Sequence, residues 1–406
     1  MSESTVSGYR LWQCSPNGTI KELGVLGVTY SASNNIDELS FQYDQDYLQS
    51  GFSIDPVALN FTGEVQVFKP EKGSLPGFVD DLLPDKWGQK LLAMSQEKRY
   101  PDKRSLIDNA HRFANLSDIT LTDYSNKKAP NLVTSIPLKE VESRLVGEDI
   151  DFSDSGMILR NLPLFLAGGG SPGGARPKLL VSDDIEWLYK FNLKNDPFDM
   201  AIAEWACLEV AHRAELNVPR HEIVKLNGQN CFRIERFDVS PQGGRYHLMT
   251  LNSLLKNEYC IDPFIAHYEE IAALIRKYSY QAEEDCKQLL GQLLINTELK
   301  NTDDHLRNFS FIHDSKGWKL TPAYDITPNL TVGNYHQLHL NKKNFFPSID
   351  NAVEMGMFLG ISKKSSEDVQ ARVMNALSQW EKILRSTDIN DHDLDKLLMI
   401  GQQKIK

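Results

Sequence analysis

The sequence predicts an α+β protein in which strands dominate the first part of the chain and helices dominate the last. Three observations support this class. Residues 8–70 are β-rich, a strand–turn–strand–helix pattern begins at Leu179, and helical spacing prevails from about residue 264 onward. With 406 residues, the chain is long enough for two or three domains.

Apolar alternation and a turn mark the first elements. Residues 9–12 and 24–30 have the pattern of strands, and Ser15-Pro16-Asn17-Gly18 between them is rich in turn-forming residues. Residues 38–43 alternate between apolar and polar side chains, which predicts another strand. Residues 76–95 then turn helical.

The middle of the chain has the order strand, turn, strand and helix. Residues 179–182 and 187–191 are expected to be strands joined by a turn at Asp183-Asp184. Residues 198–216 carry apolar side chains at helical spacing. The best linker candidate is the polar segment 125–131.

The last part of the chain is expected to be mostly helical. Residues 282–300 form a helix that leads into a polar loop, and residues 365–404 supply two or three amphipathic helices.

The composition is that of an ordinary globular protein, with 41% hydrophobic and 24% charged residues. The longest apolar run, residues 162–167, is far shorter than the roughly 20 residues that span a membrane, and the N-terminus lacks the features of a secretory signal. The net charge of −11 disfavours broad binding of nucleic acid. The five scattered cysteines are expected to be reduced thiols in a cytoplasm: Cys14, Cys207, Cys231, Cys260 and Cys286.

The polar loop carries the strongest functional signal. Asp303 is followed five positions later by Asn308, and Asp325 follows beyond a short hairpin-like stretch. In phosphoryl-transfer enzymes an Asp orients and deprotonates the acceptor hydroxyl, while an Asn and a later Asp hold Mg²⁺. The spacing therefore assigns Asp303 as catalytic base, and Asn308 and Asp325 as metal ligands. The alternative is that Asp303 and Asp304 only occupy a loop after a helix.

Three neighbours in the loop receive other assignments. The Asp-x4-Asn spacing favours Asp303 over Asp304 as the base, so Asp304 is expected to cap or solvate the loop. His305 is a candidate for nucleotide contact, and a structural imidazole bonded to loop carbonyls is favoured over a general base, because phosphoryl transfer depends mainly on positioning. Arg307 is expected either to contact the substrate or the phosphoryl group, or to lie at the surface.

A glycine-rich segment at residues 168–178 is the second functional feature. Five glycines within seven positions let backbone amides approach an anion, and Arg176 and Lys178 add positive charge. The segment matches neither a Walker loop nor a dinucleotide fold. The alternative is a flexible linker, but the strands that follow favour a phosphate loop. The expected nucleotide contacts are Ser171, Gly173, Gly174, Ala175, Arg176 and Lys178.

Lys190 lies inside the apolar strand 187–191, where burying an unpaired ammonium is costly. An ATP phosphate or Glu204 in the following helix would supply a partner, as in the lysine–glutamate pair of kinases. Lys190 is therefore assigned a catalytic and nucleotide-binding role, with Lys178 as the rival. The alternatives are a solvent-facing Lys190 and a Glu204 favoured only by the helix dipole.

Five motifs, taken in order, resemble those of the HipA family, the kinase toxins of bacterial type II toxin–antitoxin modules. The segment 75–88 is similar to the family's N-terminal subdomain motif, and 171–178 is similar to its phosphate loop. Residues 235–238 are similar to the hinge that meets adenine. Residues 301–308 and 322–325 are similar to its catalytic and metal segments.

The resemblance implies a protein-kinase-like, two-lobed α+β fold with an added N-terminal β-rich subdomain and a mainly helical C-terminal lobe. It implies ATP and Mg²⁺ as cofactors, with Glu235, Arg236 and Phe237 near the nucleotide. The expected domains are an N-terminal subdomain, a connecting segment, an N-lobe with the Gly-rich loop, and a helical C-lobe with the catalytic loop, at residues 1–110, 111–160, 161–240 and 241–406.

The resemblance also implies serine or threonine phosphorylation of a protein, such as an aminoacyl-tRNA synthetase, with Ser171 as an autophosphorylation site that would expel the loop and switch the kinase off. It implies a helix-turn-helix antitoxin that carries most contact with operator DNA, which fits the acidic charge. The alternatives are a small-molecule or lipid kinase on the same fold and a non-catalytic corepressor bound to its antitoxin.

Overall fold

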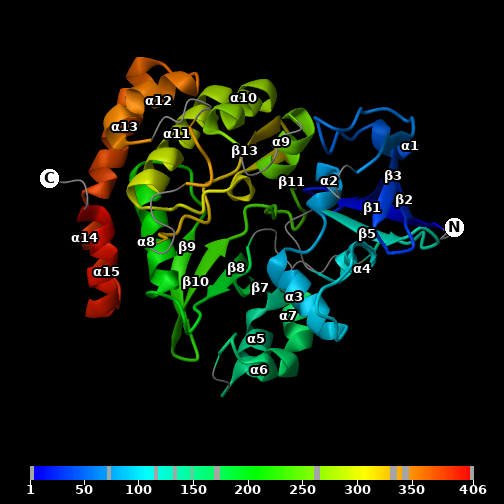
Figure 1. The fold of residues 1–406 in the computed structure, drawn as a ribbon, viewed down its shortest axis with the longest axis horizontal. Helices are drawn as coiled ribbons and strands as arrows, with labels where there is room; N and C mark the ends of the chain where they lie inside the picture. The colour runs from blue at the N-terminus through cyan, green and yellow to red at the C-terminus, as the bar shows by residue number, and fades with distance from the viewer. Residues whose placement is uncertain are drawn as a thin grey trace. The chain divides into compact units, whose positions relative to one another are not determined.

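Figure 1 shows the fold of the chain in a computed structural model. Two compact units are present, the first of residues 1–148, 154–188 and 238–259, and the second of residues 149–153, 189–237 and 260–406. The structure describes residues 4–70, 75–113, 118–130, 135–147, 150–168, 174–259, 266–329, 336–340 and 347–402.

The first unit contains a five-stranded antiparallel sheet in the order β4-β3-β2-β1-β5, in blue and cyan in Figure 1. Gly18 closes the β1–β2 turn with a φ of +81°, and its amide donates to the Ser15 carbonyl over 2.9 Å. Leu11, Leu26 and Phe41 are fully buried, so the alternation seen in the sequence builds the core. The strands are β1 (Thr5–Cys14), β2 (Ile20–Tyr30), β3 (Ile36–Tyr43), β4 (Gln66–Phe68) and β5 (Ile119–Asp123).

Short helices and strands complete the first unit. α3 (Lys86–Ser95) begins after Asp85, whose carboxylate accepts a hydrogen bond from the Gly88 amide over 2.8 Å. β6 pairs in parallel with β7, and α9 contacts α2. The bounds are α1 (Gln45–Leu48), α2 (Gly77–Asp80), α4 (Lys103–Asn109), α5 (Leu138–Leu145), α6 (Ser155–Arg160), α7 (Leu162–Gly168), α9 (Leu251–Tyr259), β6 (Ile136–Pro137), β7 (Lys178–Ser182) and β11 (His247–Thr250).

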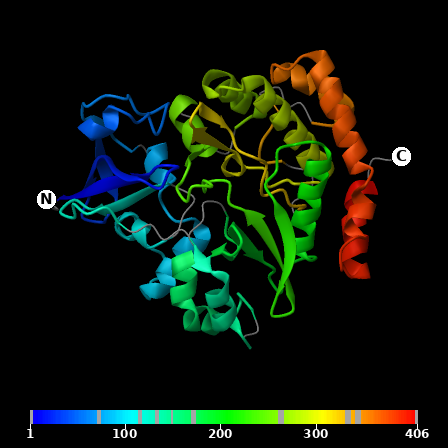
Figure 2. The same cartoon turned by 180° about the vertical axis from the view of Figure 1, so that it is seen from behind.

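β8 (Glu186–Phe191) passes from the first unit into the second after Leu188. In the second unit, β9 (His221–Leu226) and β10 (Gln229–Glu235) pair antiparallel. α8 (Met200–Arg213), which begins after the N-cap Asp199, packs against both strands, as Figure 2 shows in green.

Helices form most of the remaining second unit. α11 (Ala282–Glu298) contacts α8, α10, α12 and α13, and its leucines, including Leu289 and Leu293, are fully buried. β12 (Ser310–Asp314) and β13 (Gly317–Leu320) form an antiparallel hairpin. The other helices are α10 (Tyr268–Tyr278), α12 (Ala352–Phe358), α13 (Lys363–Leu377), α14 (Trp380–Leu384) and α15 (Asp391–Gln402). The predicted α+β class with a helical C-terminal part is thus confirmed.

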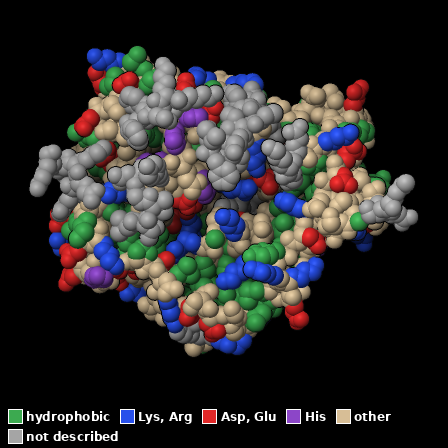
Figure 3. Space-filling model, viewed as in Figure 1, with side chains coloured by type: hydrophobic (Ala, Val, Ile, Leu, Met, Phe, Trp, Pro, Cys, Tyr) green, Lys and Arg blue, Asp and Glu red, His purple; other side chains and the backbone are tan. Residues whose placement is uncertain are grey.

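One face of the molecule shows how its charges are distributed. On the face drawn in Figure 3, acidic and basic side chains are interspersed. None of the helices within the described ranges combines the length and apolar character that crossing a bilayer requires.

Candidate active site

Lys190 on β8 contacts two carboxylates in the second unit. Its Nζ lies 2.6 Å from Oε1 of Glu204 and 2.6 Å from Oδ1 of Asp325. Only 13% of the lysine side chain is exposed. Burial alone would lower the pKa of Lys190, but the carboxylates of Asp325 and Glu204 outweigh that effect and raise it. The ammonium is therefore held charged at any physiological pH.

Local structure explains why these groups meet. In β8 the residues on either side of Lys190, Tyr189 and Phe191, are buried, so the strand anchors the lysine from the opposite face. Glu204 lies in the second turn of α8 and is itself 5% exposed. The ion pair between Lys190 and Glu204 that the sequence predicted is present. The contact with Asp325, 135 residues later in the chain, was not predicted.

The loop of Asp303 and Asn308 is closed by its own hydrogen bonds. Asn308 ends a short 3-10 helix, Leu306–Asn308, and its Nδ2 donates to the Asp303 carbonyl over 3.0 Å. The side chain of Tyr324 donates to the Arg307 carbonyl over 3.0 Å. The residue before Asp325 is thus held beside the residue before Asn308, and the predicted hairpin, β12–β13, lies between the two segments.

Asp325 and Asn308 have the properties of Mg²⁺ ligands. Asp325 adopts a φ of +57°, a conformation that costs free energy for a non-glycine residue and is often found at functional sites. Oδ1 of Asn308 is buried and has no hydrogen-bond partner within the described residues. A buried amide oxygen that receives no hydrogen bond from the described residues fits a hard cation that takes oxygen ligands. Magnesium commonly uses one or two protein oxygens together with phosphate oxygens. Within the described part of the chain, no group of three or more His, Cys, Asp or Glu side chains is placed to hold a metal ion.

The neighbouring loop residues differ in burial. Asp303 is exposed, whereas Asp304 is fully buried. His305 is half-buried, and its Nδ1 has no hydrogen-bond partner in the described ranges, so this nitrogen does not make the expected bond to a loop carbonyl. Arg307 is also half-buried.

The segment expected to meet adenine lies at the end of β10. Glu235 donates its backbone amide to the Arg220 carbonyl over 2.8 Å, and Arg236 is buried. The Phe237 ring lies 5.6 Å from the Tyr324 ring, next to Asp325. Phe237 is therefore close to the candidate metal ligand, while nucleotide contact by these residues stays a prediction.

The glycine-rich segment belongs to the first unit. Ser171 and Gly173 lie outside the described residues. Gly174 has a φ of +93°, and a Cβ built there would lie 3.6 Å from Nζ of Lys178. Ala175 and Arg176 lie between Gly174 and the start of β7. Their predicted contact with a nucleotide stays a prediction.

Lys178, the rival phosphate lysine, forms a buried ion pair. Its Nζ lies 2.9 Å from Oδ2 of Asp85, and the two side chains are 4% and 2% exposed. Asp85 was not predicted as the partner of Lys178. The available signal was an acid directly before a helix, which is a typical N-cap.

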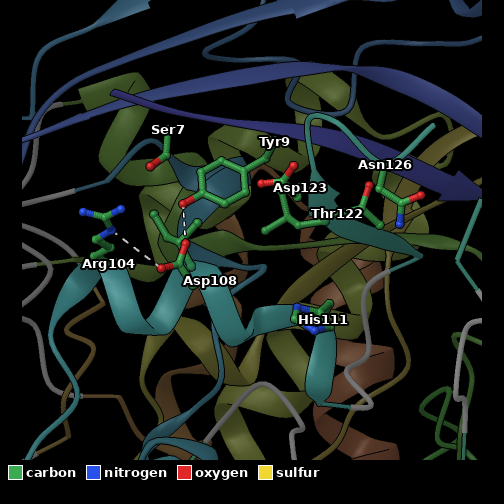
Figure 4. Close-up of a pocket in the computed structure, with 10 residues that line it drawn as sticks. Ser7, Tyr9, Arg104, Asp108, His111, Thr122, Asp123 and Asn126 are labelled. Carbon is green, nitrogen blue, oxygen red and sulfur yellow. Dashed lines mark hydrogen bonds and ion pairs between the residues drawn. The ribbon is translucent and has the colours of Figure 1, made fainter. Parts of the chain in front are cut away.

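A separate cavity of about 530 Å³ lies in the first unit. Figure 4 shows the Tyr9 hydroxyl directed at Asp108, which lies beside Arg104. None of the residues that line this cavity is a predicted site residue. The lining consists of Ser7, Tyr9, Arg104, Ile107, Asp108, His111, Leu121, Thr122, Asp123 and Asn126.

A strand lysine paired with a helix glutamate, followed by an Asp-x4-Asn loop and a later Asp, is the arrangement of kinase-like proteins. The chain belongs to the HipA family. Residues 170–381 match the HipA-like C-terminal domain, and residues 26–110 match the HipA N-terminal domain. The family predicted from the motifs is thus confirmed.

Two relatives illustrate the likeness. A Haemophilus influenzae protein described as a candidate kinase is 26% identical over 178 residues, which are 39% of this chain and 52% of that protein. The chain therefore spans about half the length of this curated relative. A chain in the Shewanella oneidensis MR-1 complex of HipA, HipB and operator DNA is 16% identical, with a TM-score of 0.63 over 96% of this chain and 95% of that one. This likeness shows a shared fold.

Proposed function

We propose that this chain is an ATP- and Mg²⁺-dependent kinase that phosphorylates serine or threonine hydroxyls of a protein. The observation that carries the proposal is the contact of Lys190 with both Glu204 and Asp325. A half-exposed acid on one side and a buried acid on the other hold the ammonium at a fixed place. From there it can bind the phosphates of a nucleotide, as the equivalent lysine of kinases does.

The chain's own residues would perform the remaining steps. Asp303 is exposed and can accept a hydrogen bond from the substrate hydroxyl. As the hydroxyl oxygen bonds to the γ-phosphorus, the bond from that phosphorus to the bridging oxygen breaks, ADP leaves, and the hydroxyl proton passes to Asp303. Lys190 stabilises negative charge on the phosphates during this transfer.

Asn308 and Asp325 are the residues that would hold Mg²⁺. Oδ1 of Asn308, which has no hydrogen-bond partner among the described residues, and the carboxylate of Asp325 would provide the oxygen ligands. When bound, Mg²⁺ neutralises phosphate charge. Since Asp325 also contacts Lys190, these two residues would place the metal and the ammonium on the same phosphates.

We further propose that the kinase is the toxin of a toxin–antitoxin module that acts in the cytoplasm. The shared fold with a chain of the HipA, HipB and operator DNA complex supports this role. A helix-turn-helix antitoxin would carry most of the DNA contact, because this chain has a net charge of −11. The proposed substrate is a translation component such as an aminoacyl-tRNA synthetase, and the proposed autophosphorylation site is Ser171.

Phosphoproteomics of a cell lysate incubated with ATP, Mg²⁺ and the purified chain tests the activity and identifies the substrate. We expect new phosphoserine or phosphothreonine in a protein with the wild type and with the surface control Asp350→Ala, but not with Asp303→Ala. Phosphorylation of only sugars or lipids would favour the small-molecule kinase instead. Equal labelling by wild type and Asp303→Ala would contradict the assigned base.

Expression in bacterial cells tests the toxin role separately. Growth arrest by the wild type should be lost in Asp303→Ala and relieved by a co-expressed antitoxin. Healthy growth with the active wild type would contradict toxicity. Intact mass after incubation with ATP, compared with Ser171→Ala, tests autophosphorylation, because each phosphoryl group adds a defined mass.

A further inference from the structure

The carboxylate of Asp304 is the centre of a buried hydrogen-bond cluster next to the proposed base. Asp304 is fully buried. Its Oδ2 accepts a hydrogen bond from the Tyr268 hydroxyl over 2.8 Å and lies 3.1 Å from Nδ1 of His336. Its Oδ1 accepts backbone amide hydrogen bonds from Gln337 over 3.0 Å and Leu338 over 3.4 Å. A buried carboxylate needs such partners to offset its lost hydration.

The cluster continues into two helices of the second unit. Nδ2 of Asn296 on α11 donates to the hydroxyl of Tyr268 on α10 over 3.1 Å. Nδ2 of Asn301 donates to Oδ1 of Asn296 over 3.0 Å. These side chains are at most 2% exposed. The loop that carries Asp303 is thus bonded through buried polar groups to two helices, and networks of this kind hold a backbone in one arrangement.

Gln337 joins this cluster to the proposed base. Its backbone amide donates to Asp304 and lies 3.2 Å from the Thr302 carbonyl. Its side-chain Nε2 donates to Oδ1 of Asp303 over 2.7 Å. One residue therefore contacts both adjacent acids, Asp304 with its backbone and Asp303 with its side chain.

The other end of the segment 336–340 is also held. The His339 amide donates to the Ala266 carbonyl over 3.3 Å, and the Tyr268 amide donates to the His339 carbonyl over 2.9 Å. The segment is thereby bonded to the start of α10 and to the catalytic loop. The backbone from which the exposed Gln337 side chain reaches Asp303 is thus held from both sides.

We propose that Gln337 is a positioning residue for Asp303 and that the Asp304 cluster holds the backbone of both residues in place. This inference rests on the proposed role of Asp303 as the base. The Gln337 amide donates to Oδ1 of Asp303, the carboxylate that is proposed to meet the acceptor hydroxyl. An amide donor to a carboxylate limits the rotation of that carboxylate, and orientation of this kind contributes to rate rather than to nucleotide binding.

Two variants of nearly equal size separate hydrogen bonding from packing. Gln337→Met removes the donor and keeps the length, so we expect kcat to fall roughly tenfold, the equivalent of one charge-assisted hydrogen bond. Gln337→Glu replaces the donor with a second carboxylate that repels Asp303, so the fall in kcat should be larger still. The KM for ATP should stay unchanged in both, because neither variant alters Lys190 or Asp325.

The measurement is phosphate transfer from ATP to myelin basic protein and to the chain itself, with purified full-length protein. Gln288→Met is the matched control, because Gln288 bonds to the backbone of Asn217 instead, and its kcat should equal that of the wild type. Tyr268→Phe tests the buried cluster and should lower both the melting temperature and kcat, measured well below the melting transition.

These measurements distinguish a failure of the proposed kinase function from a failure of the positioning role of Gln337. If the wild type transfers no phosphate that depends on Asp303, the proposed kinase function fails and this inference fails with it. If transfer depends on Asp303 but Gln337→Met and Gln337→Glu retain the wild-type kcat, the kinase function stands and the positioning role of Gln337 is overturned. A rise in the KM for ATP at unchanged kcat would also overturn it.

Discussion

The buried ion pair of Asp85 and Lys178 allows a quantitative test in the first unit. Each side chain is at most 4% exposed, and the charged atoms are 2.9 Å apart. Removing one partner leaves the other charge buried without its counter-ion, which typically costs about 3–5 kcal/mol. We therefore expect Lys178→Met to lower the free energy of unfolding by about 3 kcal/mol.

Variants of Asp85 separate the ion pair from the helix cap. Asp85→Asn keeps an acceptor for the Gly88 amide and should cost about 3 kcal/mol through the lost charge alone. Asp85→Ala also removes the N-cap of α3, which adds about 1 kcal/mol. The double variant Asp85→Asn/Lys178→Met removes both charges of this pair, so its cost should be well below the sum of the single costs, at about 2 kcal/mol.

The effect of Lys178→Met should depend on pH. Burial raises the pKa of Asp85, and the Lys178 ammonium opposes this rise. Without the ammonium, the carboxyl of the folded protein binds its proton more tightly than the carboxyl of the unfolded chain. A group with a raised folded pKa adds stability as the pH falls through that pKa. The variant should therefore regain stability towards low pH.

Urea unfolding combined with hydrogen exchange of the α3 amides measures these differences, because α3 begins directly after Asp85. Lys98→Met is the control, since Lys98 pairs with Asp102 at the surface over 4.0 Å, and such pairs contribute about 0–1 kcal/mol. If Lys178→Met costs no more than Lys98→Met, or if the double variant costs the full sum of the single variants, the reasoning is wrong.

Three more predictions concern other contacts. Burial lowers the pKa of His247, but the Asp118 carboxylate outweighs this effect and raises the pKa. The contribution of His247 to stability is therefore complete below the unfolded pKa of about 6.5, and it is lost as the pH rises through the folded pKa. His247→Gln should flatten this loss in urea unfolding at increasing pH, and an unchanged slope would contradict it. Tyr9→Phe should lower the unfolding free energy by about 1–2 kcal/mol, because the hydroxyl donates to Asp108 over 2.6 Å; a thermal melt identical to wild type would refute this. Asp325→Asn should raise the Mg²⁺ concentration for half-maximal phosphate transfer by about tenfold or more, and an unchanged Mg²⁺ titration would exclude Asp325 as a ligand.

The sequence predicted those parts of the fold that local pattern determines. The strand-like segments 9–12 and 24–30 and the alternating segment 38–43 correspond to β1, β2 and β3. The spacing of Asp303 and Asn308 predicted that both residues lie in one short loop. A short loop can be predicted in this way because its geometry depends on few residues. The pair of Lys190 and Glu204 was also predictable, because helix α8 is the next element after strand β8 in the chain.

Contacts across long stretches of sequence were not predictable. Lys178 was assigned to phosphate from its charge after the glycines, yet its ammonium contacts Asp85, 93 residues earlier. Gln337 lies 34 residues after Asp303 and carries no motif. A long-range partner is set by how the chain folds back on itself, and a single sequence contains no direct signal for that geometry.

The adjacent acids Asp303 and Asp304 show how burial divides identical chemistry. Asp304 has no exposed surface, and its carboxylate oxygens already accept several hydrogen bonds. It therefore has little capacity to bind an incoming hydroxyl. Asp303 is exposed and can still receive one. Spacing favoured Asp303 from the sequence, whereas burial gives an independent reason for the same choice. It follows that Asp303→Asn should abolish phosphate transfer while leaving the fold intact. Asp304→Asn should mainly reduce the stability of the fold, and it should lower phosphate transfer only indirectly, because the loop that carries Asp303 would shift.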